Sequence, residues 1–254
     1  MFVDSHSHIY SSDFSLDRDE VITRALEAGV ERIVLPNIDS SSVKPLLDLT
    51  DTLPGLFFPL LGLHPTSVKE DFRKELLILE YWLGKRKFYG IGEIGIDLFW
   101  DKSFLEEQIE AFTTQIGWAK SRNFPIVIHV RDSFDETMEQ LRKVYTPELR
   151  GVFHSFTGNL EQAEQIIELG FKIGINGIIT FKNSDLGETV KQIDPRHLLI
   201  ETDSPWLAPV PYRGKRNECS YVVIVANKIA ELHQTSVEKI AEVTSQNAKE
   251  LFGL

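Results

Sequence analysis

The chain has 254 residues and a single cysteine, Cys219, which excludes an intramolecular disulfide framework. Its formal net charge of −11 argues against broad, non-specific binding to duplex nucleic acid, because that mode needs many Lys and Arg side chains to neutralise phosphates. Hydrophobic residues at 42% and charged residues at 26% are typical of a folded globular protein, and the length suits one α/β barrel, so we expect a single domain over residues 1–254.

The first ten residues, MFVDSHSHIY, lack the basic and long apolar parts of a secretion signal. No apolar run in the chain approaches the roughly 18 residues that span a bilayer. A single cysteine is compatible with a reducing cytosol. We therefore expect a cytoplasmic protein that contacts no membrane, and nothing in the sequence indicates an obligate protein partner.

Apolar, β-rich runs alternate with longer helical patterns along the chain. In chain order the candidate strands are MFVDSHSH, ERIVLPNI, LFFPLLGLHP, YGIGEIGID, PIVIHV, GVFHSF, FKIGINGII and HLLIETDSP. Between them, apolar residues recur at helical spacing in the stretches 17–29, 103–123, 133–145 and 159–170. This alternation is typical of a parallel sheet, and eight strands predict a TIM-type (β/α)8 barrel. The longest irregular segment is 204–217.

Residues of metal-binding type close several of these apolar runs. They are His6, His8, Glu93, His129, His154 and Asp203. An isolated histidine of this kind is more often a polar strand end or a hydrogen-bonded core residue. In a parallel barrel, however, the C-terminal ends of all strands meet at one face, so ligands that are distant in sequence can form one site. The set therefore predicts a metal centre at that face and a metal-dependent hydrolase.

The two carboxylates of this set have distinct sequence contexts. Glu93 lies among glycines that allow close approach, and its carboxylate is suited to bridging two cations; the competing interpretation is a buried salt bridge or a hydrogen-bonded acid. Asp203 precedes Ser-Pro, where a turn-forming role competes with a catalytic one. With histidines as neutral ligands, we expect Asp203 to bind a metal and to accept a proton from the attacking water.

The motifs DSHSH, LGLHP, GEIGID, IHVRD, FHSFTG and ETDSPWLAPVPYRGKRNE, taken together, resemble those of the TatD family of metal-dependent deoxyribonucleases in the amidohydrolase superfamily. The resemblance spans essentially the whole chain. It implies one metal ion held by His6, His8, Glu93 and Asp203, and a second held by Glu93, His129 and His154. Two departures, Phe99 in place of the usual tyrosine and Cys219 in place of proline, bear on substrate preference rather than on hydrolysis.

The resemblance also implies the reaction and its cofactors. The implied activity is hydrolysis of DNA phosphodiester bonds, as a 3′-5′ exodeoxyribonuclease on single-stranded or frayed ends. The implied cofactors are two divalent metal ions, Mg²⁺ or Mn²⁺. A site with so many imidazoles also suits Zn²⁺ or another transition metal. Glu93 and Asp203 are the implied catalytic residues.

Further residues are candidates for substrate binding. By resemblance, His64 and Arg131 contact substrate phosphate just beyond their strand ends. Arg213 and Lys215, in the YRGKRN segment, are interpreted as phosphate contacts, with a solvated basic loop as the alternative. The aromatic residues Phe99, Trp100 and Trp206 either line the mouth and stack on bases or simply pack.

Two other functions fit the same residues. The ligand set also suits hydrolysis of a small ester, amide or aminoacyl bond, which fold and ligands alone do not separate from phosphodiester cleavage. A third possibility is a catalytically silent, metal-stabilised scaffold whose rim binds a partner.

Overall fold

The structure, a computed structural model, describes all 254 residues as alternating strands and helices. The strands are β1 (Phe2–Asp4), β2 (Val30–Leu35), β3 (Phe57–Pro59), β4 (Ile91–Asp97), β5 (Ile126–Arg131), β6 (Gly151–Phe153), β7 (Lys172–Ile175) and β8 (Leu198–Ile200). The α-helices are α1 (Arg18–Glu27), α2 (Ser40–Thr52), α3 (Phe72–Leu83), α4 (Leu105–Arg122), α5 (Phe134–Val144), α6 (Leu160–Glu168), α7 (Leu186–Val190), α8 (Val222–Leu232) and α9 (Val237–Phe252). Short 3₁₀ helices are η1 (Ser12–Phe14), η2 (Pro65–Ser67), η3 (Gly177–Thr180), η4 (Pro195–His197) and η5 (Cys219–Tyr221).

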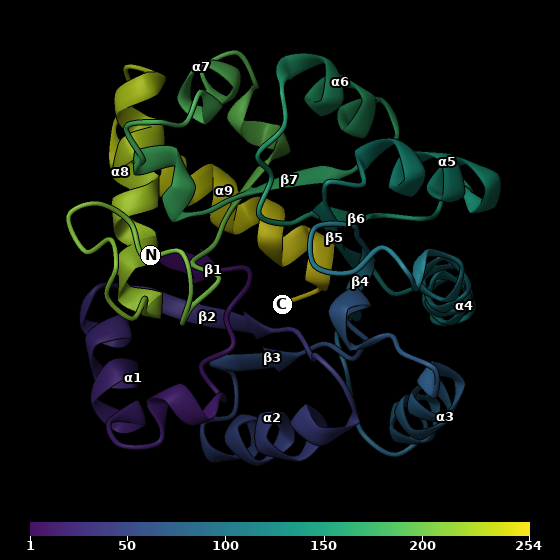
Figure 1. Cartoon of the computed structure of the whole chain (residues 1–254). Coiled ribbons are helices and arrows are strands. Elements are labelled where there is room, and N and C mark those ends of the chain that lie inside the picture. Colours follow the sequence, from purple (N-terminus) through teal and green to yellow (C-terminus); the bar gives the residue numbers. More distant parts are fainter.

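All strand pairs are parallel, and the order of the strands follows the sequence. One ladder contains β1, β2 and β3 in that order, and the other contains β4, β5, β6, β7 and β8 in that order. Isolated parallel bridges, Leu61 with Ile91 and Ser7 with Ser204, connect the two ladders at both edges. Helices α1 to α8 form a ring around these strands (Figure 1). This is the predicted (β/α)8 architecture.

The predicted elements are present with ends that shift by a few residues. Each expected strand overlaps one of the eight observed strands, and α1, α4, α5 and α6 fall within the four expected helical stretches. Segment 204–217 is irregular, as expected. Six of the strands, all except β4 and β5, end earlier than the apolar runs do, so several candidate ligands lie one or more residues beyond a strand. No helix is long and apolar enough to cross a bilayer.

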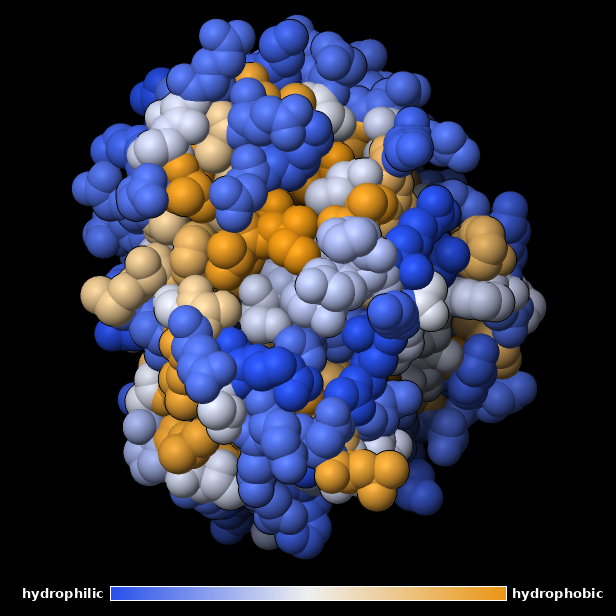
Figure 2. All heavy atoms as spheres, turned by 90° about the vertical axis from the view of Figure 1, so that its left-hand side faces the viewer, coloured by the Kyte–Doolittle hydropathy of each residue, from blue (hydrophilic) through white to orange (hydrophobic).

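The interior of the barrel is closed on one side by α9. Strand residues such as Val34, Val127 and Leu199 form a buried cluster with Leu251 and Phe252 of that helix. Because Val127 precedes His129 in β5 by two residues, this cluster lies below the candidate ligands and leaves the C-terminal ends of the strands free. Seen from the side of α1 and α8, the surface is mainly hydrophilic, with a patch of hydrophobic side chains near its middle (Figure 2).

Gly95 allows β4 and β5 to approach each other beside the candidate ligands. It pairs with His129 and has a φ of 152°, a value that residues with a side chain rarely adopt. A Cβ atom at this position would overlap the carbonyl oxygen of His129. A glycine is therefore required between Glu93 and Asp97.

We predict that Gly95→Ala lowers the free energy of unfolding by at least about 2 kcal/mol, because the added methyl group forces β4 and β5 apart. Urea unfolding measures this change. The control is Gly117→Ala in α4, where an added Cβ meets no atom within 4 Å; it should stabilise the helix by up to about 1 kcal/mol. Equal stability of the Gly95→Ala variant and the unchanged protein would contradict this account of β4.

Candidate metal centre

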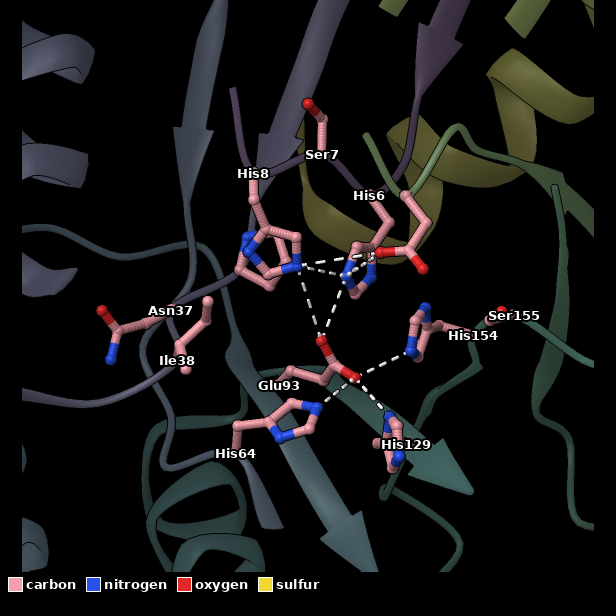
Figure 3. A network of polar contacts seen from close by, with 12 residues as sticks. His6, Ser7, His8, Asn37, Ile38, His64, Glu93, His129, His154 and Ser155 are labelled. Atoms are coloured by element: carbon pink, nitrogen blue, oxygen red, sulfur yellow. Dashed lines mark hydrogen bonds and ion pairs between the residues drawn. The ribbon is translucent and has the colours of Figure 1, made fainter. Parts of the chain in front are cut away.

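The six expected ligands converge at the C-terminal ends of the strands. His6 and His8 follow β1, and His154 and Asp203 follow β6 and β8. Glu93 and His129 lie within β4 and β5. Figure 3 shows Glu93 at the centre, with imidazoles pointing at it from both sides. The structure therefore brings together residues that are up to 197 positions apart in the sequence, such as His6 and Asp203.

The carboxylate of Glu93 faces two sets of imidazoles. Its Oε2 lies 3.1 Å from His6 Nε2 and 3.7 Å from His8 Nε2. Its Oε1 lies 2.7 Å from His129 Nδ1 and 2.7 Å from His154 Nε2. Each oxygen thus has its own group of nitrogen donors, which is the arrangement of a bridging carboxylate.

Asp203 completes the group on the side of Oε2. Its Oδ1 lies 3.8 Å from His6 Nε2 and 3.9 Å from His8 Nε2. Its backbone N–H donates to the carbonyl oxygen of His6 at 2.9 Å. Burial raises the pKa of the Asp203 carboxyl to about 8. Burial by itself therefore disfavours the charged form of this carboxyl, and a bound cation would stabilise that form.

A buried carboxyl group beneath the site ties the ends of β1 and β8 together. The Asp4 side chain accepts hydrogen bonds from Thr202 N–H at 2.9 Å and from the Thr202 hydroxyl at 2.7 Å. It also accepts one from His6 N–H at 3.3 Å. Burial raises the pKa of Asp4 to about 7. These bonds fix the position of His6 relative to Asp203.

The donor set fits divalent cations. Three overlapping groups of three residues each offer ligand atoms within 4.8 Å of one another: His6, His8 and Asp203; His6, Glu93 and His154; and His64, Glu93 and His129. The most deeply buried members are His6, His8, Glu93 and His154. No Lys or Arg side chain forms an ion pair with Glu93. Burial opposes ionisation of Glu93, but the surrounding imidazoles, led by His154, outweigh it and hold its pKa well below the usual range. A carboxylate with several imidazoles suits Zn²⁺ and other transition metals as well as Mn²⁺.

Side chains behind two of the histidines determine which ring nitrogen carries the proton. The Tyr10 hydroxyl donates to the Pro36 carbonyl oxygen at 2.7 Å, so its oxygen accepts from His8 Nδ1–H at 2.8 Å. Asp97 Oδ2 accepts from His129 Nε2–H at 2.9 Å. When a cation binds, the nitrogen of each ring that faces Glu93 can therefore offer its lone pair, as metal binding requires. Glu201 has a similar place behind His154, with Oε1 3.5 Å from Nδ1.

Three residues at the site are not among those predicted from the sequence: Tyr10, Asp97 and Glu201. The sequence did contain an indication that Asp97 belongs to the site. Side chains at positions 93, 95 and 97 of one strand lie on the same face, so Asp97 is on the face of Glu93. Glu201 is two residues before Asp203, in the candidate strand HLLIETDSP. The role of Tyr10 depends on its contact with the Pro36 carbonyl oxygen, which the sequence does not reveal.

A cavity of about 630 Å³ lies over these groups. Its wall includes Trp100, Arg131 and Trp206, together with His64 and Asp203. Both tryptophans are exposed residues: Trp100 is 69% exposed and Trp206 is 48% exposed. Ligand cavities commonly have volumes of roughly 300 to 1,000 Å³, so this one is large enough for a nucleotide-sized group.

Arg131 offers a cation to this cavity. Its guanidinium lies 3.8 Å from the centre of the Phe99 ring and 5.3 Å from that of Trp100. It forms no ion pair with a carboxylate. The aromatic rings thus hold the guanidinium in place and leave its N–H groups free to bind an anion.

The structure does not place Arg213 and Lys215 in the wall of the cavity. Arg213 lies over the Phe181 ring at 4.5 Å, and Lys215 lies 6.0 Å from the Tyr212 ring centre. Segment 204–217 is instead anchored by Arg216, whose guanidinium pairs with Asp17 at 2.5 Å. This anchoring directs Trp206 and Leu207, rather than the two cations, toward the cavity.

The fold and this centre are those of a metal-dependent hydrolase, and comparisons with known proteins identify its family. The family model of the TatD-related DNases matches residues 3–253, so the chain belongs to this family. The chain is 38% identical over 253 residues to the metal-dependent hydrolase YabD of Bacillus subtilis, with 99% of each chain covered. It is 32% identical over 254 residues to the metal-dependent hydrolase YcfH of Escherichia coli, covering 98% of this chain and 95% of YcfH. The crystal structure of the TatD homologue YjjV of E. coli superposes with a TM-score of 0.93 at 30% identity, covering 100% and 98% of the two chains.

We predict that Asp97→Asn weakens metal binding on the His129 side about 10- to 100-fold. Asp97 Oδ1 accepts from the backbone N–H groups of Phe99 and Trp100, so an asparagine keeps its oxygen there and turns its NH₂ group toward His129. The proton of His129 then moves to Nδ1, which faces Glu93. Calorimetric titration with Mn²⁺ measures the effect, with the exposed Asp101→Asn as the matched control. Unchanged affinity in the Asp97→Asn variant would show that Asp97 does not orient His129.

Proposed function

We propose that the protein hydrolyses phosphodiester bonds of DNA with two divalent ions, and that it removes nucleotides from the 3′ ends of single-stranded or frayed DNA. The observation that carries the proposal is the division of the Glu93 carboxylate between two groups of imidazoles beneath one cavity. Membership of the TatD-related DNases supports DNA as the substrate.

The residues fall into two sets of ligands that share Glu93. His6, His8 and Asp203 would hold one ion together with Glu93, and His129 and His154 would hold the other together with the same carboxylate. When bound, a pair of Mg²⁺ or Mn²⁺ ions polarises the phosphoryl group, lowers the pKa of water and stabilises the leaving oxygen.

Asp203 is the proposed proton acceptor. Its side chain lines the cavity, and its Oδ1 lies 3.8 Å from His6 Nε2, so it would be close to a water activated by the ion that these residues would hold. Asp4, through Thr202 and His6, keeps this carboxyl group in place relative to the ligands.

The cavity wall supports a substrate with a single anionic strand and exposed bases. Arg131 provides one cation for a phosphate, and the exposed faces of Trp100 and Trp206 are suited to base stacking, which contributes roughly 1 to 3 kcal/mol per base in single-strand binders. In a chain of net charge −11, such local contacts favour a few nucleotides at the end of a strand over a long duplex tract.

The test is degradation of single-stranded DNA labelled at its 3′ or 5′ end by metal-stripped protein resupplied with Mg²⁺ or Mn²⁺. We expect immediate release of the 3′ label and progressive shortening of the 5′-labelled strand, with chelator abolishing both. Asp203→Asn should stay folded and lose essentially all activity, because it lacks the charged ligand and proton acceptor. Intact DNA together with turnover of an acyl ester by metal-loaded protein would replace this proposal with the acyl hydrolase.

A further inference from the structure

Leu207 has a backbone conformation that is unfavourable for leucine. Its φ is 56°, in the left-handed region that glycine and asparagine adopt readily and that residues with a branched side chain rarely adopt. The residue lies in the irregular segment 204–217, four positions after Asp203, and it lines the cavity over the metal centre. Glycine or asparagine would form this turn with less strain, so a leucine here indicates a function for its side chain.

Neighbouring groups hold the backbone of Leu207 in this conformation. The side-chain amide of Asn217 donates to the carbonyl oxygens of Thr202 and Trp206, both at 2.7 Å. The carbonyl oxygen of Leu207 packs against Gly177, where an added Cβ atom would overlap it. This oxygen is therefore turned toward η3, and the side chain is the part of Leu207 that remains to line the cavity.

Leu207 and Ile178 form an apolar part of the cavity wall. Both residues line the cavity, and both are only partly exposed. Ile178 belongs to η3, and the Thr180 hydroxyl at the end of that helix accepts a hydrogen bond from Val210 N–H at 2.9 Å. This bond joins η3 to the segment that carries Leu207. A ligand hydroxyl group held against Leu207 and Ile178 would lose its hydrogen bonds to water and would find no side-chain partner on either residue.

This part of the wall lies where the sugar of a bound nucleotide would be. In the proposed function, the phosphate binds over Glu93 and a base stacks on Trp206. The Trp206 ring lies beside the metal centre, with its centre 5.1 Å from that of the His8 ring. In a nucleotide the sugar connects the base to the phosphate, so it would occupy the space between Trp206 and Glu93. Leu207 follows Trp206 directly in the chain and lines this space.

We infer that Leu207 selects the sugar of the substrate. Its side chain, with that of Ile178, packs against C2′ of deoxyribose and disfavours ribose, whose 2′-hydroxyl group would be left without a hydrogen-bond partner. This inference rests on the proposed function. It also explains the strained backbone: an asparagine would relax it but would offer its amide group to the 2′-hydroxyl. An apolar wall rejects an added hydroxyl group by a factor on the order of 10 to 100, so Leu207 favours DNA over RNA.

The test compares Leu207→Asn with Leu207→Met. Asparagine is close to leucine in shape and can bond a hydroxyl group, whereas methionine keeps an apolar side chain of similar volume. Calorimetry of the Mn²⁺-loaded proteins measures their affinities for 2′-deoxyadenosine 5′-monophosphate and for adenosine 5′-monophosphate. We expect the unchanged protein and Leu207→Met to bind the deoxynucleotide about tenfold more tightly than the ribonucleotide. In Leu207→Asn the two affinities should agree within about twofold.

A second measurement needs no substitution. It compares two single-stranded DNA molecules that differ only in the 2′-hydroxyl group of the last nucleotide, and we expect kcat/KM for its release to be about tenfold higher without the hydroxyl group. Equal affinity of the unchanged protein for the two nucleotides would overturn the inference, as would equal release or a preference that Leu207→Asn retains. If the protein left DNA intact but showed the expected nucleotide affinities, only the proposed function would fail.

Discussion

The structure depends on one buried charge, the carboxylate of Glu93. An isolated ionised carboxyl group in a protein interior is strongly unfavourable, so it requires compensating partners on every side. Here the partners are imidazoles from the ends of β1, β3, β5 and β6, and together they keep the group ionised. A closed parallel barrel provides this geometry, because it alone brings so many strand ends around one point.

The surrounding framework keeps the partners at fixed distances. Asp4 links the strand ends that carry His6 and Asp203, and Gly95 allows the close pairing that sets Glu93 beside His129. On the opposite side, α9 fills the interior of the barrel with apolar contacts. Rigid packing at one end thus supports a polar, open site at the other, which is the arrangement required to hold catalytic groups in place.

The sequence predicted the barrel and the converging residues well, for a physical reason. Strands buried on both faces are long apolar runs, so a histidine or a carboxylate at the end of a run is conspicuous. Contacts between distant segments are not visible in this way. The pairing of Arg216 with Asp17 anchors segment 204–217 with Arg213 and Lys215 outside the cavity wall, and the hydrogen-bond partners behind His8 and His129 are Tyr10 and Asp97. Only the folded chain brings these groups together.

The central claim is that Glu93 bridges two ions through its separate oxygens. Crystals soaked in Mn²⁺ and measured by anomalous diffraction test this claim most directly. The account predicts two anomalous peaks roughly 4 Å apart, one beside Oε2 with His6, His8 and Asp203, and one beside Oε1 with His129 and His154. A single peak, or a second ion bound away from Glu93, would contradict it.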